Sequence, residues 1–141
     1  MSNIPHIIHY CWFGGKEMPS ETLKYIEAWK KILPNWEFIC WTEKNFDIDD
    51  SIPYVKEAYE AKKYAFVSDV ARLYALVTEG GIYMDTDVEV LKPLDNFLTL
   101  DAFSGFENEK CVPTGIMACR KSFPLFESFL LEYEKIHFKI V

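Results

Sequence analysis

Residues 79 to 87 of this chain read Glu79-Gly80-Gly81-Ile82-Tyr83-Met84-Asp85-Thr86-Asp87. The Gly-Gly pair can end a helix, and the apolar residues after it predict a short β-strand. Asp85 and Asp87 follow that strand, where side chains two residues apart share a face, so both carboxylates can converge on one point. An isolated Asp-x-Asp is more often an ordinary turn. Here its place at the carboxyl end of a strand, where α/β sheets bind ligands, favours a site for a divalent cation such as Mg²⁺.

The segment before the glycines predicts a helix that starts at Tyr64, and it contains Ser68-Asp69-Val70-Ala71-Arg72. Asp69 and Arg72 are three residues apart and therefore lie on one face of that helix. A surface ion pair of little energetic value is the ordinary interpretation. The apolar residues around the pair favour a buried face instead, where carboxylate and guanidinium could bind the hydroxyls or phosphate of a ligand.

The rest of the chain predicts alternating strands and helices. A strand over Pro5–Phe13, a helix with Ser20 as its N-cap and a strand over Trp36–Trp41 form a β-α-β unit, which implies parallel strands. Expected beyond them are a helix from Pro53, the helix from Tyr64, strands over 82–84, 102–106 and 115–119, and a closing helix over 123–138. The fold class is therefore α/β, with one mostly parallel sheet and flanking helices.

Composition limits the function classes. Half of the 141 residues are apolar and 16% are aromatic, enough for the core of one ordinary domain and too many for a disordered chain. The net charge is −7, so nucleic acid is not an expected partner, and a phosphate-bearing ligand would need a local cation. We find no membrane-spanning run and no secretory start, which predicts a cytoplasmic protein.

The cysteines and histidines receive structural interpretations. Cys11, Cys40, Cys111 and Cys119 lack metal-binding spacing and are expected to be reduced, mostly buried thiols. His6 and His9 are expected to be buried and hydrogen-bonded, whereas His137 is expected on the surface.

Three segments together resemble glycosyltransferase family 32, the sugar-binding DXD-motif glycosyltransferases, and more distantly the large glucosylating toxins. They are Trp12-Phe13-Gly14-Gly15, Ser68 to Arg72, and Gly80 to Asp87. The segment Asp87 to Leu94 is typical of members in capsular or surface polysaccharide synthesis. The resemblance implies a GT-A fold, a Rossmann-like single sheet. It also implies a retaining hexosyl transfer from a UDP- or GDP-sugar to a saccharide or lipid-linked saccharide, with Mn²⁺ or Mg²⁺ as cofactor.

The resemblance also implies a role for each matching residue. Trp12 would stack on the nucleotide base, although a core tryptophan is the ordinary interpretation of such a residue. Asp69 and Arg72, with Ser68 beside them, would hold the donor sugar. Asp87 would bind the metal directly, and Asp85 would contact the metal, ribose or sugar. Asp85, Asp87 and Arg72 are the expected catalytic residues.

The chain departs from the family pattern at its end. Family members usually continue for another segment that carries acceptor-side residues, so the expectation is one nucleotide-sugar-binding domain over 1–141, truncated on the acceptor side. Apolar surface left exposed there would favour self-association. A lipid-linked acceptor would draw the protein to the inner face of the membrane. The alternatives are a non-catalytic nucleotide-sugar-binding module and, third, a nucleotidyltransferase.

Overall fold

The computed structural model describes residues 3–104 and 115–139. Five strands form one sheet in the order β2-β1-β3-β5-β4. Their bounds are β1 Ile7–Cys11, β2 Glu37–Trp41, β3 Gly81–Met84, β4 Ala102–Ser104 and β5 Ile116–Cys119. The helices are α1 Ser20–Ile32, α2 Pro53–Glu60, α3 Tyr64–Glu79 and α4 Pro124–Glu134, with a 3-10 turn, η1, at Asp95–Phe97.

The sheet is mixed: the strands from the first part of the chain pair in parallel, and the strands from its later part pair antiparallel. β1 pairs in parallel with β2, as the predicted β-α-β unit requires, and also pairs in parallel with β3. β5 pairs antiparallel with β3 on one side and with β4 on the other. The α/β class with flanking helices is thereby confirmed, and parallel pairing is confined to the first three strands.

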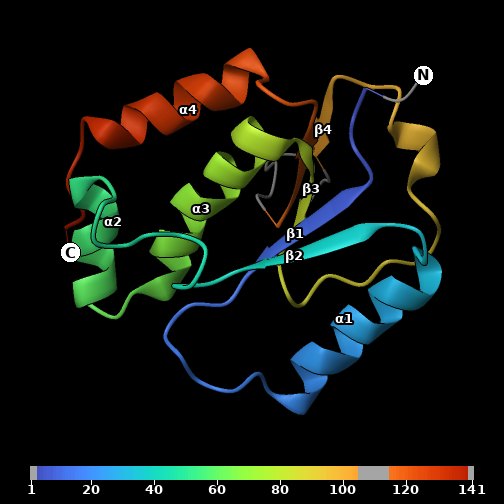
Figure 1. Cartoon of the computed structure of the whole chain (residues 1–141), viewed down its shortest axis with the longest axis horizontal. Helices are drawn as coiled ribbons and strands as arrows, with labels where there is room; N and C mark the ends of the chain where they lie inside the picture. The colour runs from blue at the N-terminus through green and yellow to red at the C-terminus, as the bar shows by residue number, and fades with distance from the viewer. Residues whose placement is uncertain (1–2, 105–114, 140–141) are drawn as a thin grey trace, which may run out of the picture.

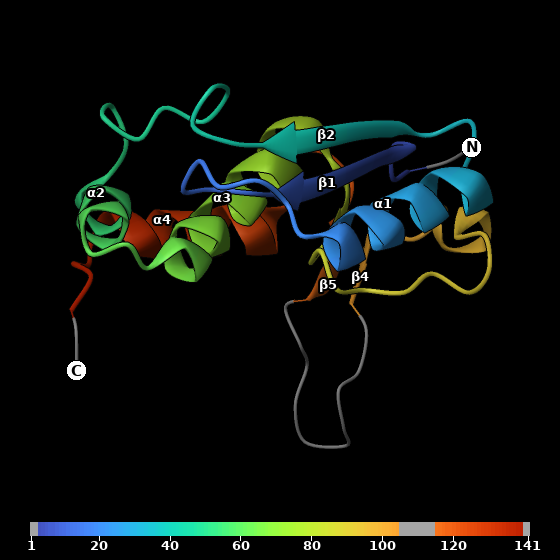
Figure 2. The same cartoon turned by 90° about the horizontal axis from the view of Figure 1, so that it is seen from below.

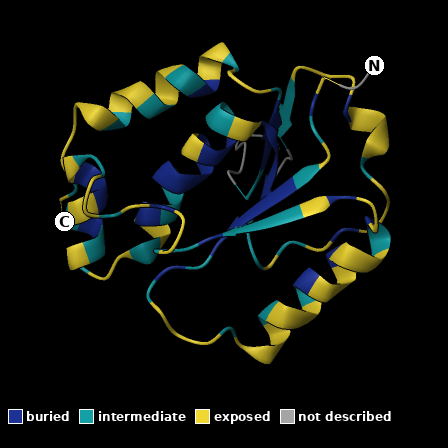
Figure 3. Ribbon diagram, viewed as in Figure 1, coloured by how far each residue is buried: buried dark blue, intermediate teal, exposed yellow. Residues whose placement is uncertain are grey.

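Helices cover both faces of the sheet, α1 on one and α2, α3 and α4 on the other (Figures 1 and 2). The strand residues alternate between the two faces, as a period of two demands. Ile8, Ile82 and Ala118 belong to the core under α1, whereas Cys11, Tyr83 and Cys119 belong to the core under α3. Figure 3 shows that the middle strands and the inner face of α3 are buried, while α1 and α4 expose their outer faces.

The turn between α3 and β3 depends on two glycines. Gly80 ends α3 as predicted, with φ +71° and ψ −179°, a positive φ whose ψ lies outside the left-handed helical region. Gly81 has φ +113°, and a Cβ there would lie 2.6 Å from the backbone oxygen of Ile7. Only glycine fits this close approach, which brings β3 directly beside β1.

Several helix ends differ from the sequence-based expectation. Ser20 is the first residue of α1 and makes no capping hydrogen bond, so its prediction as N-cap is wrong. Pro19 takes that position, since its φ of −59° suits the extended entry and its carbonyl accepts the helical hydrogen bond from Leu23. α4 ends at Glu134 rather than 138. The predicted strand over 102–106 is seen as far as Ser104, and the residues after it lie outside the described ones.

Most cysteine and histidine interpretations are confirmed. Cys11 and Cys119 are buried, Cys40 is partly buried, and all three are free thiols, whereas Cys111 lies outside the described residues. His9 is fully buried, with Nε2 2.8 Å from the carbonyl of Gly80 and Nδ1 accepting from the indole of Trp41. His137 is on the surface, paired with Glu57. The prediction that His6 is buried is wrong: it precedes β1, its side chain is 47% exposed, and its Nε2 lies 3.5 Å from Oδ1 of the exposed Asp95 in η1.

No helix in the described part of the chain has the length and hydropathy needed to cross a membrane.

Candidate functional site

A cleft of about 560 Å³ opens where β1 and β3 end against the first half of α3. All six residues singled out from the sequence as ligand-binding residues line it, together with eight others. The lining comprises Cys11, Trp12, Phe13, Gly14, Lys16, Tyr64, Ala65, Ser68, Asp69, Arg72, Tyr83, Asp85, Thr86 and Asp87. Three segments far apart in the sequence therefore meet at one place.

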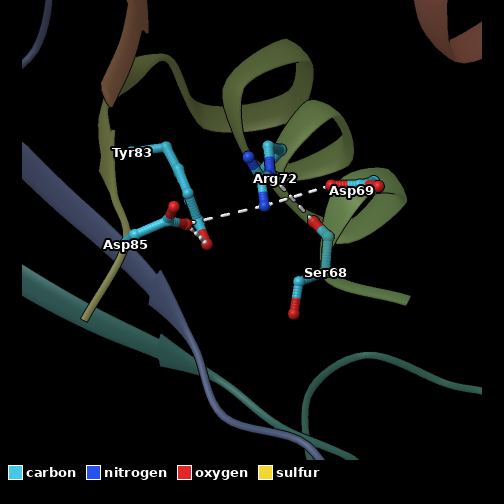
Figure 4. Close-up of polar contacts among 5 residues, drawn as sticks. All are labelled: Ser68, Asp69, Arg72, Tyr83 and Asp85. Carbon is cyan, nitrogen blue, oxygen red and sulfur yellow. Dashed lines mark hydrogen bonds and ion pairs between the residues drawn. The ribbon is translucent and has the colours of Figure 1, made fainter. Parts of the chain in front are cut away.

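Asp69 and Arg72 enter the cleft from α3, one helical turn apart. Arg72 is buried, with a side chain only 8% exposed, and its Nη2 lies 3.2 Å from Oδ1 of Asp69. Its Nε also donates to the backbone oxygen of Ser68, at 3.3 Å, which holds the guanidinium along the helix (Figure 4). The predicted buried position is confirmed for Arg72, whereas the side chain of Asp69 is 36% exposed at the cleft.

Asp85 joins the pair from the end of β3. Its Oδ1 lies 3.5 Å from Nη2 of Arg72 and accepts a hydrogen bond of 2.9 Å from the hydroxyl of Tyr83. The Arg72 guanidinium also lies over the Tyr83 ring, 4.5 Å from its centroid. One buried cation therefore connects two carboxylates that come from different elements, and an aromatic ring supports it.

Tyr83 was not assigned a role from the sequence. It lies two residues before Asp85 on the same strand, so the period of two already placed the phenol and the carboxylate on one face. Burial raises the pKa of Tyr83 well above its ordinary value, so its hydroxyl stays protonated and donates to Asp85. Tyr64 and Lys16 were also missed, because nothing in their local pattern distinguishes them from a helix start and a loop residue.

Burial shapes the electrostatics of the cleft. The pKa of Asp69 is raised, first because the carboxyl is partly desolvated, while Arg72 opposes the shift and Asp85 adds to it. Burial raises the pKa of Cys11 to about 12, so this thiol in the cleft wall is neutral and unreactive at ordinary pH. The charged groups that face a ligand are therefore the three carboxylates and Arg72, with Lys16 beside them.

Asp87 differs from Asp85 in its surroundings. It lies in the turn after β3, which is closed by a hydrogen bond of 3.1 Å from the Val88 amide to the Asp85 carbonyl, and it is exposed. The described residues contain no cluster of three or more metal-ligating side chains. Two carboxylates alone suit a hard cation such as Mg²⁺, which commonly takes one or two carboxylates and obtains its other ligands from water and substrate phosphates.

Trp12 forms the wall opposite α3. Its backbone amide donates to the carbonyl of Trp41, and its indole Nε1 donates to the carbonyl of Lys16 at 2.7 Å. The indole is partly exposed, so the core interpretation of Trp12 does not hold. A second cleft, of about 540 Å³, lies on the other side of this wall and shares Trp12, Gly14 and Lys16 with the first.

Comparisons with known proteins show which proteins this chain is similar to. The family model described as the glycosyltransferase sugar-binding region containing the DXD motif matches residues 19–104. An uncharacterized glycosyltransferase of Acanthamoeba polyphaga mimivirus is 36% identical over 133 residues, which cover 88% of this chain and 53% of that protein. Inositol phosphoceramide mannosyltransferase 3 of Schizosaccharomyces pombe is 30% identical over 135 residues, covering 92% of this chain and 36% of that protein.

The solved structure of the PaToxG glycosyltransferase has a similar fold. Its TM-score is 0.75 at 20% identity, over 90% of this chain and 59% of that one. The chain thus spans about half, or less, of the length of the curated relatives named here.

Proposed function

The chain belongs to the family of glycosyltransferases whose sugar-binding region contains a DXD motif, and we propose that its cleft binds the nucleotide-sugar donor in a metal-dependent glycosyl transfer. The proposed donor is a UDP- or GDP-sugar, and the proposed cation is Mn²⁺ or Mg²⁺. The unit that does this is proposed to be one donor-binding domain that includes all the described elements.

One observation carries the proposal: an aromatic wall, a buried arginine with its carboxylates and an exposed carboxylate line the same cleft. Each suits one part of a nucleotide-sugar. The partly exposed indole of Trp12 would stack on the base. Asp69 and Arg72, beside Ser68, would bind sugar hydroxyls through charge-assisted hydrogen bonds. Asp85, held by Tyr83 and Arg72, would meet the ribose or the sugar.

Charge explains why a cation belongs in the proposal. The chain carries a net charge of −7, and in the cleft Arg72 is already paired with Asp69 and Asp85. Lys16 adds one positive charge at the cleft, fewer than the negative charges that a diphosphate carries, so a further cation is needed, and Asp87, with Asp85 near it, supplies oxygen ligands for one. When bound, such a cation stabilises the negative charge that develops on the leaving diphosphate. Asp85, Asp87 and Arg72 are accordingly the proposed catalytic residues.

The proposed reaction retains the anomeric configuration. Asp69 and Asp85, the carboxylates proposed to contact the sugar, lie 3.2 Å and 3.5 Å from Nη2 of Arg72, and this pairing weakens them as nucleophiles. A front-face reaction, in which the leaving phosphate acts as the base, requires no enzyme nucleophile and fits this arrangement.

The proposed acceptor is a saccharide or lipid-linked saccharide of surface or capsular polysaccharide synthesis. A relative is named as an inositol phosphoceramide mannosyltransferase, which supports a lipid-linked acceptor. The protein would then act in the cytoplasm at the inner face of the membrane, recruited by its substrate.

Self-association is also part of the proposal. It would be favoured by apolar side chains that α4 exposes, namely Leu125, Phe129 and Leu131. Sedimentation velocity measures it directly.

A second candidate function is a non-catalytic nucleotide-sugar-binding module. The observation that favours it is the coverage of the relatives, since the chain matches 53% and 36% of their lengths. Both functions require donor binding, and only the first requires sugar transfer.

Calorimetric titration of UDP and GDP, with Mn²⁺ and then with EDTA, tests the proposal. We expect binding of one nucleotide that depends on Mn²⁺ and is lost in Asp87→Ala. Asp49→Ala, at an exposed aspartate outside the cleft, is the matched control and should bind like the wild type. Hydrolysis or transfer of the corresponding nucleotide-sugar then separates enzyme from binding module. A folded wild type that binds neither nucleotide would overturn both functions.

A further inference from the structure

The loop Trp12 to Lys16, between β1 and α1, forms the wall between the two clefts. Gly14 has φ +104° and Gly15 has φ +75°, conformations that residues with side chains rarely adopt. Because the indole Nε1 of Trp12 donates to the carbonyl of Lys16, the position of the indole depends on the path of this loop. Two consecutive glycines give that path little stiffness of its own, so something outside the loop must fix it.

Glu43, just after β2, makes the contact that fixes it. Its Oε2 accepts a hydrogen bond of 2.7 Å from the amide of Gly14 and another of 2.8 Å from the hydroxyl of Tyr59. Partial burial alone would raise the pKa of the Glu43 carboxyl, but these bonds hold it below its ordinary value. The carboxylate therefore joins the loop to α2 through a single oxygen atom.

Tyr64 supports the loop from the side of α3. A Cβ placed on Gly14 would lie 2.6 Å from Cε2 of Tyr64, so the loop backbone passes directly against this ring. The Tyr64 ring in turn meets the Tyr59 ring at 5.5 Å between centroids. Gly14 is thus held between a hydrogen-bonded carboxylate and an aromatic ring, and both are attached to α2 or α3.

We propose that Glu43 is a positioning residue, whose carboxylate holds the Gly14 backbone and thereby keeps the Trp12 indole in place as the stacking surface for the nucleotide base. The inference rests on the proposed function for the identity of the ligand. The anchoring itself does not depend on the ligand and is measured separately. Glu43 acts through the loop, and the charge of its carboxylate is not what the ligand recognises.

Three variants separate anchoring from charge. Glu43→Ala removes both hydrogen bonds. Glu43→Gln removes the charge but keeps one oxygen that can accept from both donors, because both wild-type bonds end on the same atom. Tyr59→Phe leaves the carboxylate but removes its link to α2. Glu60→Ala, at an exposed residue next to Tyr59, is the matched control.

The first measurement is acrylamide quenching of tryptophan fluorescence without ligand. Trp29, Trp36 and Trp41 are at most 8% exposed, so quenching reports mainly on Trp12. Glu43→Ala should increase the quenching constant and Tyr59→Phe should increase it less, whereas Glu43→Gln and Glu60→Ala should stay near the wild-type value. Circular dichroism confirms that each variant is folded.

The second measurement is the Kd of the UDP or GDP that the wild type binds with Mn²⁺. Glu43→Ala should weaken binding about tenfold, and Glu43→Gln by no more than about threefold. A folded Glu43→Ala with wild-type quenching and Kd would overturn the inference, as would a Glu43→Gln variant as weak as Glu43→Ala. If the wild type binds neither nucleotide, the proposed function fails and the role of Glu43 toward a base fails with it. Quenching then decides only whether Glu43 anchors the loop.

Discussion

Nη2 of Arg72 lies 3.5 Å from Oδ1 of Asp85, so the middle of α3 is tied to the end of β3 inside the cleft. The same nitrogen lies 3.2 Å from Oδ1 of Asp69. A buried guanidinium between two carboxylates satisfies its own charge and fixes both acids in position. The Asp-x-Asp segment and the helix before it therefore form one polar unit rather than two separate motifs.

Arg72→Ala tests this unit. It leaves two carboxylates without their cation, and we expect the free energy of unfolding to fall by about 2–3 kcal/mol. A fully buried pair would cost about 3–5 kcal/mol, but the side chains of Asp69 and Asp85 are 36% and 39% exposed, so water partly solvates them. Arg120→Ala, which breaks the more exposed pair with Asp101, should cost less than about 1 kcal/mol. If urea titrations gave Arg72→Ala and Arg120→Ala equal losses of unfolding free energy, Arg72 would not be the centre of a buried polar unit.

Tyr83→Phe separates the phenol hydroxyl from the ring. The ring remains beside Arg72, while Asp85 loses the hydrogen bond of 2.9 Å. We expect a loss of about 1 kcal/mol in unfolding free energy and nucleotide binding weakened about fivefold. The control is Tyr74→Phe, at an exposed tyrosine outside the cleft, which should change neither quantity. Unchanged nucleotide affinity in Tyr83→Phe would show that Asp85 does not need this support.

Gly115→Ala tests the position of Asp85 by steric means. A Cβ on Gly115 would lie 3.1 Å from Oδ2 of Asp85. Gly81 has φ +113°, and a Cβ there would lie 2.6 Å from the backbone oxygen of Ile7. Gly115→Ala should therefore weaken nucleotide binding about threefold to tenfold with little loss of stability. Gly81→Ala should destabilise the fold by about 2 kcal/mol or more. Thermal melts measure the loss of stability and calorimetry measures the loss of nucleotide binding. A strongly destabilised Gly115→Ala would contradict the expectation that this change mainly displaces Asp85.

His9 predicts a dependence of stability on pH. Burial lowers the pKa of His9 below its ordinary value, against the opposing effects of the Gly80 carbonyl, Glu79 and Glu37. The unfolded chain then binds more protons than the folded one, so this contribution to stability is complete above about pH 6.5 and is lost as the pH falls below that value. Urea titrations between pH 7 and 5 should show that the free energy of unfolding falls with pH in the wild type. In His9→Gln the free energy of unfolding should change less steeply with pH. Equal slopes would mean that His9 does not titrate on unfolding.

Local patterns in the sequence predicted the kinds of element and their approximate positions. Strong local patterns predicted the strand after Gly80-Gly81 and the helix from Tyr64, and both occur where expected. The i, i+3 spacing of Asp69 and Arg72 and the period of two in β3 also fixed which side chains share a face. Local pattern was weakest at element ends, where Pro19 replaced Ser20 as the cap and α4 ended at Glu134.

The contacts between these faces depend on how the elements pack in three dimensions. The contact between Arg72 and Asp85, the placing of Trp12 across from α3 and the hydrogen bond from Gly14 to Glu43 all join different elements. Spacing along the chain carries no information about such contacts, since they follow from the parallel pairing of β1 with β2 and β3 and from the packing of α3 on that sheet. The direction of β5 likewise follows from its antiparallel pairing with β3 and not from its sequence, because an apolar strand can pair in either direction.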